Sequence, residues 1–267
     1  MDDSPIKWRV NLRSRCSVLL FGEYMAADAA PRETLLRDMK YQKMAPTLNH
    51  DRIRRAIARY LASPTHDYRI LASCRETLER ERDAAVNPQR RENLTFETRA
   101  LDVFERSLNG LGMTGLNFEL AAPSPALKIG GVSVSVQPTA HIRVRRARGA
   151  DLMGAIVVDT AKGQTPKTEP AKRRTNKAMY CSAIMVHLYL LREFAADDPK
   201  ASAEHSIIFH TTRQDRVCAP DNYQRMLRNF EADCRGIERA WPYISPPPGF
   251  DPDSDRYLPR SRETRVI

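Results

Sequence analysis

The sequence has few cysteines, and none of them form the patterns of disulfide-rich or zinc-binding proteins. Its five cysteines are an odd number, lie far apart along the chain, and include no Cys-x-x-Cys pair. Neither a disulfide framework nor a structural zinc site is therefore expected. Cys181 and Cys234 fall on the apolar faces of expected helices, where a small thiol packs as a hydrophobic group. A reducing cytoplasm is the expected compartment.

Long apolar runs and nucleotide-binding glycine motifs are also lacking. The apolar patch at residues 17–21 is too short for a signal peptide or a membrane span, so we expect no membrane association. The sequence has no Gly-x-Ser-x-Gly, Walker or Gly-x-Gly-x-x-Gly pattern. These absences argue against a serine hydrolase, a P-loop NTPase and a dinucleotide-binding enzyme.

Positive charge is abundant and concentrated in one part of the chain. The 267 residues carry a formal net charge of +10. Residues 139–177 hold ten basic and three acidic residues, a net charge of +7. Such a concentration favours a polyanionic partner, with nucleic acid and above all DNA as the first expectation. The alternative is a solvated strand edge and loop whose charge only maintains solubility.

Hydrophobic periodicity predicts three regions. Residues 1–94 are expected to be a mostly helical N-terminal region, residues 95–245 an α/β core, and residues 246–267 a flexible Pro-rich tail. Val132, Val134 and Val136 alternate with polar residues, which is typical of a half-buried strand. The nearly continuous apolar run 152–158 indicates a strand at the centre of a sheet. With helices expected at 95–111, 179–194 and 221–241 and a further strand at 206–212, the predicted fold is α/β with a mixed sheet flanked by helices.

Three short motifs resemble the PD-(D/E)XK nuclease superfamily, particularly its RecB-like exonuclease branch. Residues 138–144 lie where that family has the strand carrying its first catalytic Asp. Asp159 and Lys162 follow the central strand, where the family has an acidic residue, one intervening residue and a Lys. Asn176 and Tyr180 resemble the Gln-x-x-x-Tyr motif of the branch, with Asn in place of Gln. The resemblance implies a restriction-endonuclease-like sheet.

The family's chemistry gives these residues expected roles. Two carboxylates hold Mg²⁺ or Mn²⁺ beside the scissile phosphate, and a Lys positions the attacking water. The resemblance assigns catalytic roles to Asp159, Lys162 and Glu97, and metal contacts to Asp159, Asp151 and Glu97, where Glu97 is the helix carboxylate of the family. Two departures from the pattern stand out. No Asp or Glu occurs between Glu119 and Asp151, and the second motif is Asp-x-x-Lys.

Three hypotheses follow. The first is a nucleic-acid-binding protein with a nuclease-like core and eroded catalysis, which needs no cofactor. The second is an active DNA nuclease that depends on Mg²⁺ or Mn²⁺. The third is an assembly component that docks a protein partner through its helical N-terminal region and binds no nucleic acid. Under the first two, the expected nucleic-acid contacts are Arg143, Arg145, Arg146, Arg148, Lys167, Lys172, Arg173, Arg174, Lys177 and Tyr180.

Overall fold

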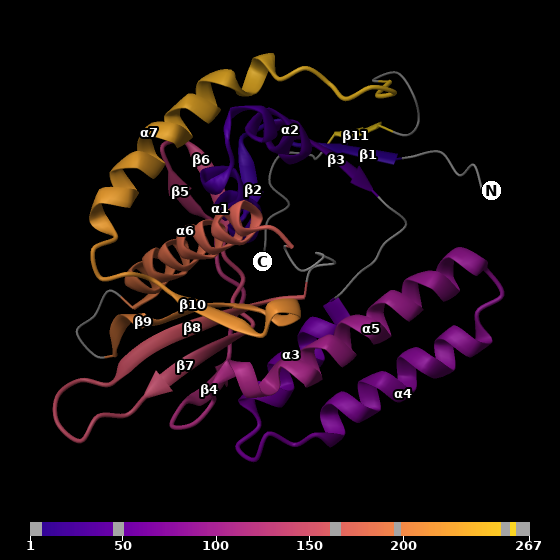
Figure 1. Cartoon of the computed structure of the whole chain (residues 1–267), viewed down its shortest axis with the longest axis vertical. Coiled ribbons are helices and arrows are strands. Elements are labelled where there is room, and N and C mark those ends of the chain that lie inside the picture. The colour runs from indigo at the N-terminus through magenta and orange to yellow at the C-terminus, as the bar shows by residue number, and fades with distance from the viewer. Residues whose placement is uncertain (1–6, 45–50, 161–166, 195–198, 252–256, 260–267) are drawn as a thin grey trace.

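A computed structural model describes residues 7–44, 51–160, 167–194, 199–251 and 257–259 (Figure 1). These residues form an α/β protein with seven α-helices and three sheets. The α/β class expected from the sequence is therefore confirmed. Within the described ranges, no helix is long and apolar enough to cross a membrane.

The central sheet has five strands and mixed direction. Its order is β10 (Asp215–Cys218), β9 (Lys200–His210), β8 (Leu152–Asp159), β7 (Ala140–Val144) and β4 (Asn117–Leu120). β8 and β9 are parallel, and the other neighbouring pairs are antiparallel. Residues 153–158 of β8 are all buried. The apolar run of the sequence is thus the middle strand, as its composition predicts.

Helices cover both faces of this sheet (Figure 1). α1 (Val18–Ala26) and α6 (Glu169–Glu193) pack on one face, whereas α3 (Asp51–Ala62), α4 (Arg69–Ala84) and α5 (Pro88–Leu111) pack on the other. The strand side chains alternate between the two cores. Ala155 and Val157 of β8 join the core of α1 and α6, and Ile156 and Val158 join the core of α3, α4 and α5.

A glycine allows α1 and α6 to approach closely. A Cβ atom at Gly22 would overlap the Ser182 hydroxyl and the Ala178 carbonyl of α6. Across the same contact, Ser182 Oγ donates a hydrogen bond of 3.0 Å to the Val18 carbonyl. The residue after Gly22 is Glu23, so this contact brings a carboxylate of α1 beside α6.

Residues 1–94, expected to be a mostly helical region, contain α1 to α4 and the start of α5. α5 runs continuously through position 94, and α1 packs on α6 far along the chain. The first 44 residues also contain α2 (Ala29–Lys40) and three short strands, β1 (Lys7–Val10), β2 (Arg15–Ser17) and β3 (Tyr41–Met44). β1 pairs with β11 (Tyr257–Pro259), which lies within the tail expected to be flexible.

One strand joins a different sheet from the one expected. β6 (Val132–Ser135) has the alternating burial that its sequence predicts, but it pairs with β2 and with β5 (Leu127–Ile129) rather than with β7. β4 occupies the edge beside β7 instead. α7 (Gln224–Ala240) packs over β5 and β6, which closes the core on the α1 side.

Candidate active site

Asp159 ends the central strand on the face that α1 and α6 cover. Side chains alternate along a strand, so Asp159 follows Val157 onto that face. In the neighbouring parallel strand, His210 pairs with Asp159 in register and follows Ile208 onto the same face. Thr211 Oγ1 donates a hydrogen bond of 3.0 Å to the Asp159 carbonyl, which joins the two strand ends. Ligands in open α/β sheets commonly bind beside such carboxyl ends of parallel strands.

A cavity of about 500 Å³ opens at this point between α1, α2, α6 and the ends of β8 and β9. We call it the Asp159 cavity. Apolar side chains from α1, α2 and α6 form part of its wall. Its polar lining residues are Glu23, Thr34, Asp159, Arg174, Thr175, Ser182 and His210. Such a pocket, apolar with a few convergent polar groups, is the usual form of a small-ligand site.

Glu23 and Asp159 are electrostatically coupled. Burial is the main cause that raises the pKa of the Glu23 carboxyl above its usual value, and the negative charge of Asp159 raises it further. The Arg174 guanidinium acts in the opposite direction on the same carboxyl. Glu23 as a whole residue is exposed, but its carboxyl lines the cavity, where the surrounding protein atoms partly exclude water from it. Two carboxylates and one guanidinium therefore share this site.

His210 contributes a buried nitrogen with unused hydrogen-bonding capacity. Its side chain is only 8% exposed, and within the described ranges its Nδ1 has no hydrogen-bond partner. A buried polar atom without a partner is unfavourable and uncommon in folded proteins. A water molecule or a polar ligand in the Asp159 cavity can supply the missing partner.

Thr139 lies directly before β7, in the segment 138–144 where the resemblance expects a catalytic Asp. Its backbone N–H donates to the Ile156 carbonyl at 2.7 Å, and its Oγ1 accepts a hydrogen bond from the Val158 N–H at 3.0 Å. The side chain thus fixes β8 next to Asp159 but brings no charge. His141 in the same segment forms a 2.9 Å hydrogen bond with the Tyr189 hydroxyl and lies against Phe194. Both contacts fit a packing role.

Glu97 and Asp151 lie away from Asp159. Glu97 is on α5, on the opposite face of the sheet, where burial raises the pKa of its carboxyl and Arg52 lowers it. Asp151 precedes β8 at its other end, about 26 Å from Asp159, since a strand rises about 3.3 Å per residue. One metal ion therefore cannot contact both Asp159 and Asp151, and Glu97 lies on the face of the sheet away from the Asp159 cavity. Lys162 lies outside the described residues.

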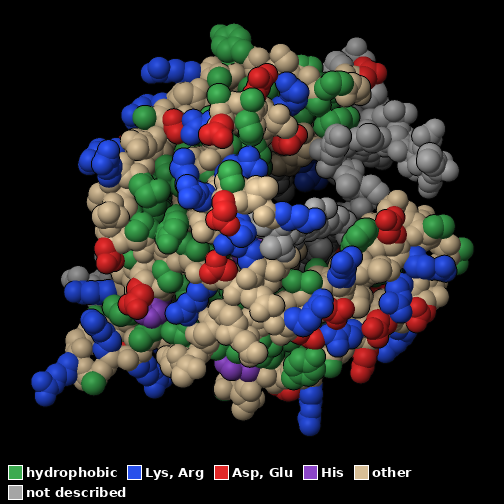
Figure 2. All heavy atoms as spheres, in the orientation of Figure 1, with side chains coloured by type: hydrophobic (Ala, Val, Ile, Leu, Met, Phe, Trp, Pro, Cys, Tyr) green, Lys and Arg blue, Asp and Glu red, His purple; other side chains and the backbone are tan. Residues whose placement is uncertain are grey.

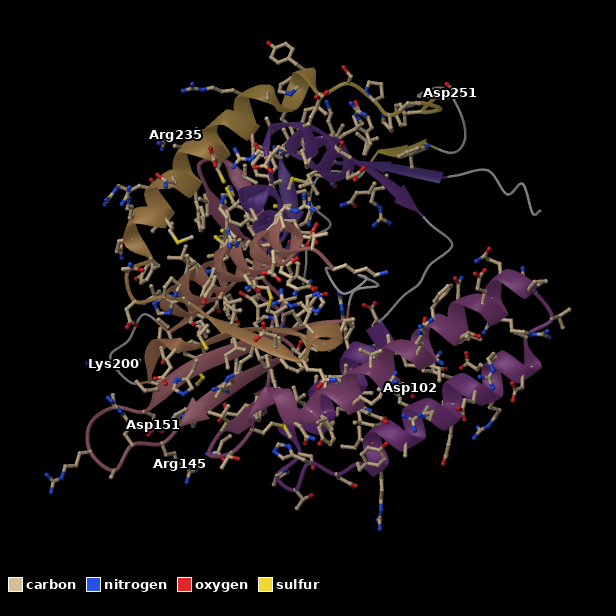
Figure 3. The ribbon with its side chains drawn as sticks, in the orientation of Figure 1. Asp102, Arg145, Asp151, Lys200, Arg235 and Asp251 are labelled. Atoms are coloured by element: carbon tan, nitrogen blue, oxygen red, sulfur yellow. The ribbon has the colours of Figure 1, made fainter. Side chains whose placement is uncertain are left out.

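The basic stretch of the sequence forms two separate groups. Arg145, Arg146 and Arg148 lie in the connection between β7 and β8, at the end of the sheet where Figure 3 shows Arg145, Asp151 and Lys200. Arg143 at this end is paired with Glu119 at 2.7 Å and with Asp151 at 3.7 Å. This end of β8 is opposite to the Asp159 cavity.

The second group surrounds the start of α6, beside the Asp159 cavity. Arg174 lines the cavity, and Arg173, Lys177 and Tyr180 recur at helical spacing along an exposed face of α6. Lys167 precedes the helix, and Lys172 pairs with Glu169 at 2.7 Å in its first turn. Asn176, in the place of the family's Gln, has a buried Oδ1 without a partner in the described part of the chain.

Sequence reasoning missed Glu23 and His210. The signal for Glu23 was a single carboxylate within the apolar segment 18–26, which is too short to show a clear helical period. The signal for His210 was its position at the end of a strand that follows a long helix, since such a strand pairs in parallel with the one before the helix. The histidines of the sequence are scattered without metal-ligand spacing, so no pattern singles out His210.

The fit of these residues to a divalent cation is partial. Mg²⁺ is commonly held by one or two carboxylates together with waters and a substrate phosphate. Glu23 and Asp159 could supply the two carboxylates of such a site. Among the residues that the structure describes, however, no group of three or more His, Cys, Asp or Glu side chains is arranged to hold a metal ion.

Comparisons with known proteins identify no relative of this chain. No protein-family model matches the sequence, no curated protein matches it significantly, and no solved structure matches it significantly.

Proposed function

We propose that the protein binds nucleic acid through a restriction-endonuclease-like core and that the Asp159 cavity receives a phosphate group of the bound strand. The observation that carries the proposal is the position of the second basic group at the start of α6. Arg174 lines the Asp159 cavity, and Arg173, Lys177 and Tyr180 extend from it along an exposed helix face. Cations in a row can track a phosphate backbone, and an exposed aromatic ring can stack on a base.

The order of elements supports this core. A hairpin of β7 and β8 is followed by the long helix α6 and by β9, which lies parallel to β8. This order is the one that the PD-(D/E)XK resemblance implies after its first helix. Asp159 lies at the end of β8, and Thr139, directly before β7, accepts a hydrogen bond from the neighbouring Val158 N–H. Asp159 at the end of β8 and Asn176 on α6 support the proposed core, since the resemblance expects its second motif after a central strand and its Gln-x-x-x-Tyr motif on the next helix.

Binding without catalysis is the primary form of the proposal. The segment where the resemblance expects the first catalytic Asp contains the uncharged Thr139, whose hydroxyl already accepts a backbone hydrogen bond. Asp159 and Glu23 then repel a phosphate, and Arg174 offsets part of that repulsion. Replacement of either carboxylate by its amide should strengthen binding in the absence of a metal ion.

Fluorescence anisotropy with labelled single- and double-stranded DNA across a salt series tests the proposal. We expect the logarithm of affinity to fall linearly with the logarithm of salt concentration. The double variant R173Q/K177Q should weaken binding and reduce the slope by about 1 to 2, since each lost phosphate contact lowers it by about 0.9. The matched control R145Q/R148Q removes the same charge at the opposite end of β8. Equal losses in both variants, or no binding at low salt, would contradict the proposal, and the latter would favour the protein-assembly hypothesis.

A second candidate function is a Mg²⁺- or Mn²⁺-dependent phosphodiesterase, and the proximity of Glu23 to Asp159 favours it. The two carboxylates would hold the cation, which would polarise the phosphate. DNA recovered from the binding reactions with Mn²⁺ is analysed on a gel. Cleavage that is lost in E23Q and D159N but kept in D151N would support this function, because Asp151 lies at the other end of β8. Intact DNA under all conditions, with tighter binding by E23Q and D159N, would leave only the binding protein.

A further inference from the structure

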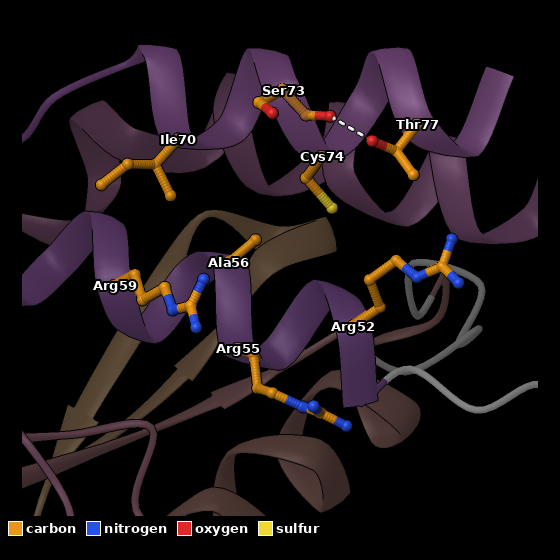
Figure 4. A pocket seen from close by; sticks show the side chains of 8 residues that line it. All are labelled: Arg52, Arg55, Ala56, Arg59, Ile70, Ser73, Cys74 and Thr77. Atoms are coloured by element: carbon orange, nitrogen blue, oxygen red, sulfur yellow. Dashed lines mark hydrogen bonds between the residues drawn. The ribbon is translucent and has the colours of Figure 1, made fainter. Parts of the chain in front are cut away.

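A second cavity lies between α3 and α4, on the side of the central sheet opposite to the Asp159 cavity (Figure 4). We call it the α3–α4 groove, and its volume is about 460 Å³. α3 supplies three arginines to one wall, and α4 supplies small polar side chains to the other. The lining residues are Arg52, Arg55, Ala56, Arg59, Ile70, Ser73, Cys74 and Thr77.

The lining contains three guanidinium groups and no carboxylate. Arg52 is paired with Glu81 at 2.9 Å. Arg55 and Arg59 are exposed, and no carboxylate of the described residues forms an ion pair with either of them. They lie four residues apart, so their Cβ atoms are about 5–6 Å from each other on one side of the helix. Over α4 and α5, acidic side chains are interspersed with basic ones (Figure 2). The groove lining differs from this surrounding surface because it contains no carboxylate.

The α4 wall adds hydrogen-bond donors without adding negative charge. Thr77 Oγ1 donates to the Ser73 carbonyl at 2.8 Å, the bond drawn in Figure 4. Within the described ranges the Ser73 hydroxyl has no such partner, so its proton is available to a ligand. Burial raises the pKa of the Cys74 thiol, which keeps that side chain neutral near pH 7. The groove thus offers cations and one hydroxyl, and its natural ligand is an anion with several acceptor oxygens.

We infer that the α3–α4 groove binds phosphate groups of a polyphosphate or phosphodiester chain. A phosphate presents several acceptor oxygens, so it can accept from a guanidinium fork on α3 and from the Ser73 hydroxyl on α4 at the same time. Two guanidiniums one helical turn apart can bind successive phosphates of such a chain. This site is independent of the Asp159 cavity, because it uses other elements on the other face of the sheet.

Isothermal titration calorimetry with inorganic tripolyphosphate, and anisotropy with a labelled 20-nucleotide single strand, test the inference on the full-length protein. The groove variant is R55Q/R59Q. The matched control is R54Q/R80Q, which removes two exposed arginines from the same two helices without touching the lining. Gln has nearly the helix propensity of Arg, and circular dichroism and thermal melting verify that both variants fold.

At least one of the two probes should bind about tenfold more weakly to R55Q/R59Q than to the wild type, because this variant loses two charge-assisted contacts. The same probe should bind R54Q/R80Q as tightly as the wild type. If only tripolyphosphate shows this difference, the ligand is a free polyphosphate. If the single strand shows it, the ligand is nucleic acid. Equal weakening in both double variants, or no binding of either probe, overturns the inference. Failure of the Asp159 cavity proposal is recognised separately, because R173Q/K177Q reports on that site alone.

Discussion

The contact between α1 and α6 predicts opposite effects of the same substitution at two helical glycines. Gly22→Ala places a Cβ atom into the Ser182 hydroxyl and the Ala178 carbonyl. The hydroxyl can rotate away, but the carbonyl belongs to the α6 backbone and can move only with the helix. Gly236→Ala on α7 places its Cβ in open space, with nothing within 4 Å. Both substitutions remove a helical glycine, so they differ in packing alone.

The expected magnitudes follow from these contacts. Gly236→Ala should stabilise the protein by about 0.5–1 kcal/mol, the usual gain in helix propensity and chain entropy. Gly22→Ala gains the same amount but overpacks the interior at a cost of about 1–3 kcal/mol, which leaves a net loss of about 0.5–2 kcal/mol. For a protein of this size, that loss lowers the melting temperature by roughly 2–4 °C per kcal/mol. Displacement of α1 should also move Glu23 out of the Asp159 cavity.

Urea denaturation followed by circular dichroism, with both variants and the wild type in one buffer, measures the difference. The midpoint for Gly22→Ala should lie below the wild type and that for Gly236→Ala above it, with equal slopes for all three proteins. If Gly22→Ala were as stable as the wild type, the α1–α6 approach described above would be incorrect. In that case the position of Glu23 beside Asp159 would lose its structural basis.

Two further predictions concern the same core and its histidines. Ser182→Ala removes the hydrogen bond to the Val18 carbonyl and should lower the free energy of unfolding by about 1 kcal/mol. The loss should be smaller in the Gly22→Ala background, because there the Ser182 hydroxyl overlaps the new Cβ atom. A double-mutant cycle by urea denaturation measures this coupling. Burial lowers the pKa of His141 below its ordinary 6.5, so between these two pKa values the unfolded chain binds more protons than the folded chain. The neutral imidazole therefore contributes stability that is complete above pH 6.5 and is lost as the pH falls toward the folded-state pKa. His141→Gln should therefore reduce the loss of stability between pH 7.5 and 5.5, and an unchanged pH dependence would count against the buried position of this imidazole.

Sequence patterns predicted the centre of the fold better than its margins. The apolar run of β8 could only be a central strand, and the period of two along it places Asp159 on a definite face. Short strands such as β2, with three residues, have too few side chains to show a period, so the partner of β6 was not predictable. α1 has the same difficulty, since its nine residues are nearly all apolar.

The sequence also concealed where the charges lie in space. Residues 139–177 look like one basic block, but β7 and β8 reverse direction within it. The reversal puts Arg145 and Arg148 at the far end of the sheet and returns the chain to the cavity at Asp159. Charge density along a chain therefore predicts a surface only where the chain does not turn back. Glu97 shows the same limitation, because its position in the order of motifs suggested a shared site with Asp159, whereas α5 covers the opposite face of the sheet.

The packing of α1 on α6 also matters while the chain is being made. About 140 residues separate the end of α1 from the start of α6, which a ribosome adds in roughly 10–30 s. During that time α2 is the only neighbouring helix of α1 that the described chain has made, so Phe21 and Met25, both buried in the finished core, lack the cover of α6 and α7. α3, α4 and α5 follow one another directly and can pack together as they emerge. The nascent chain therefore carries an apolar N-terminal segment that a chaperone can recognise before the central sheet exists.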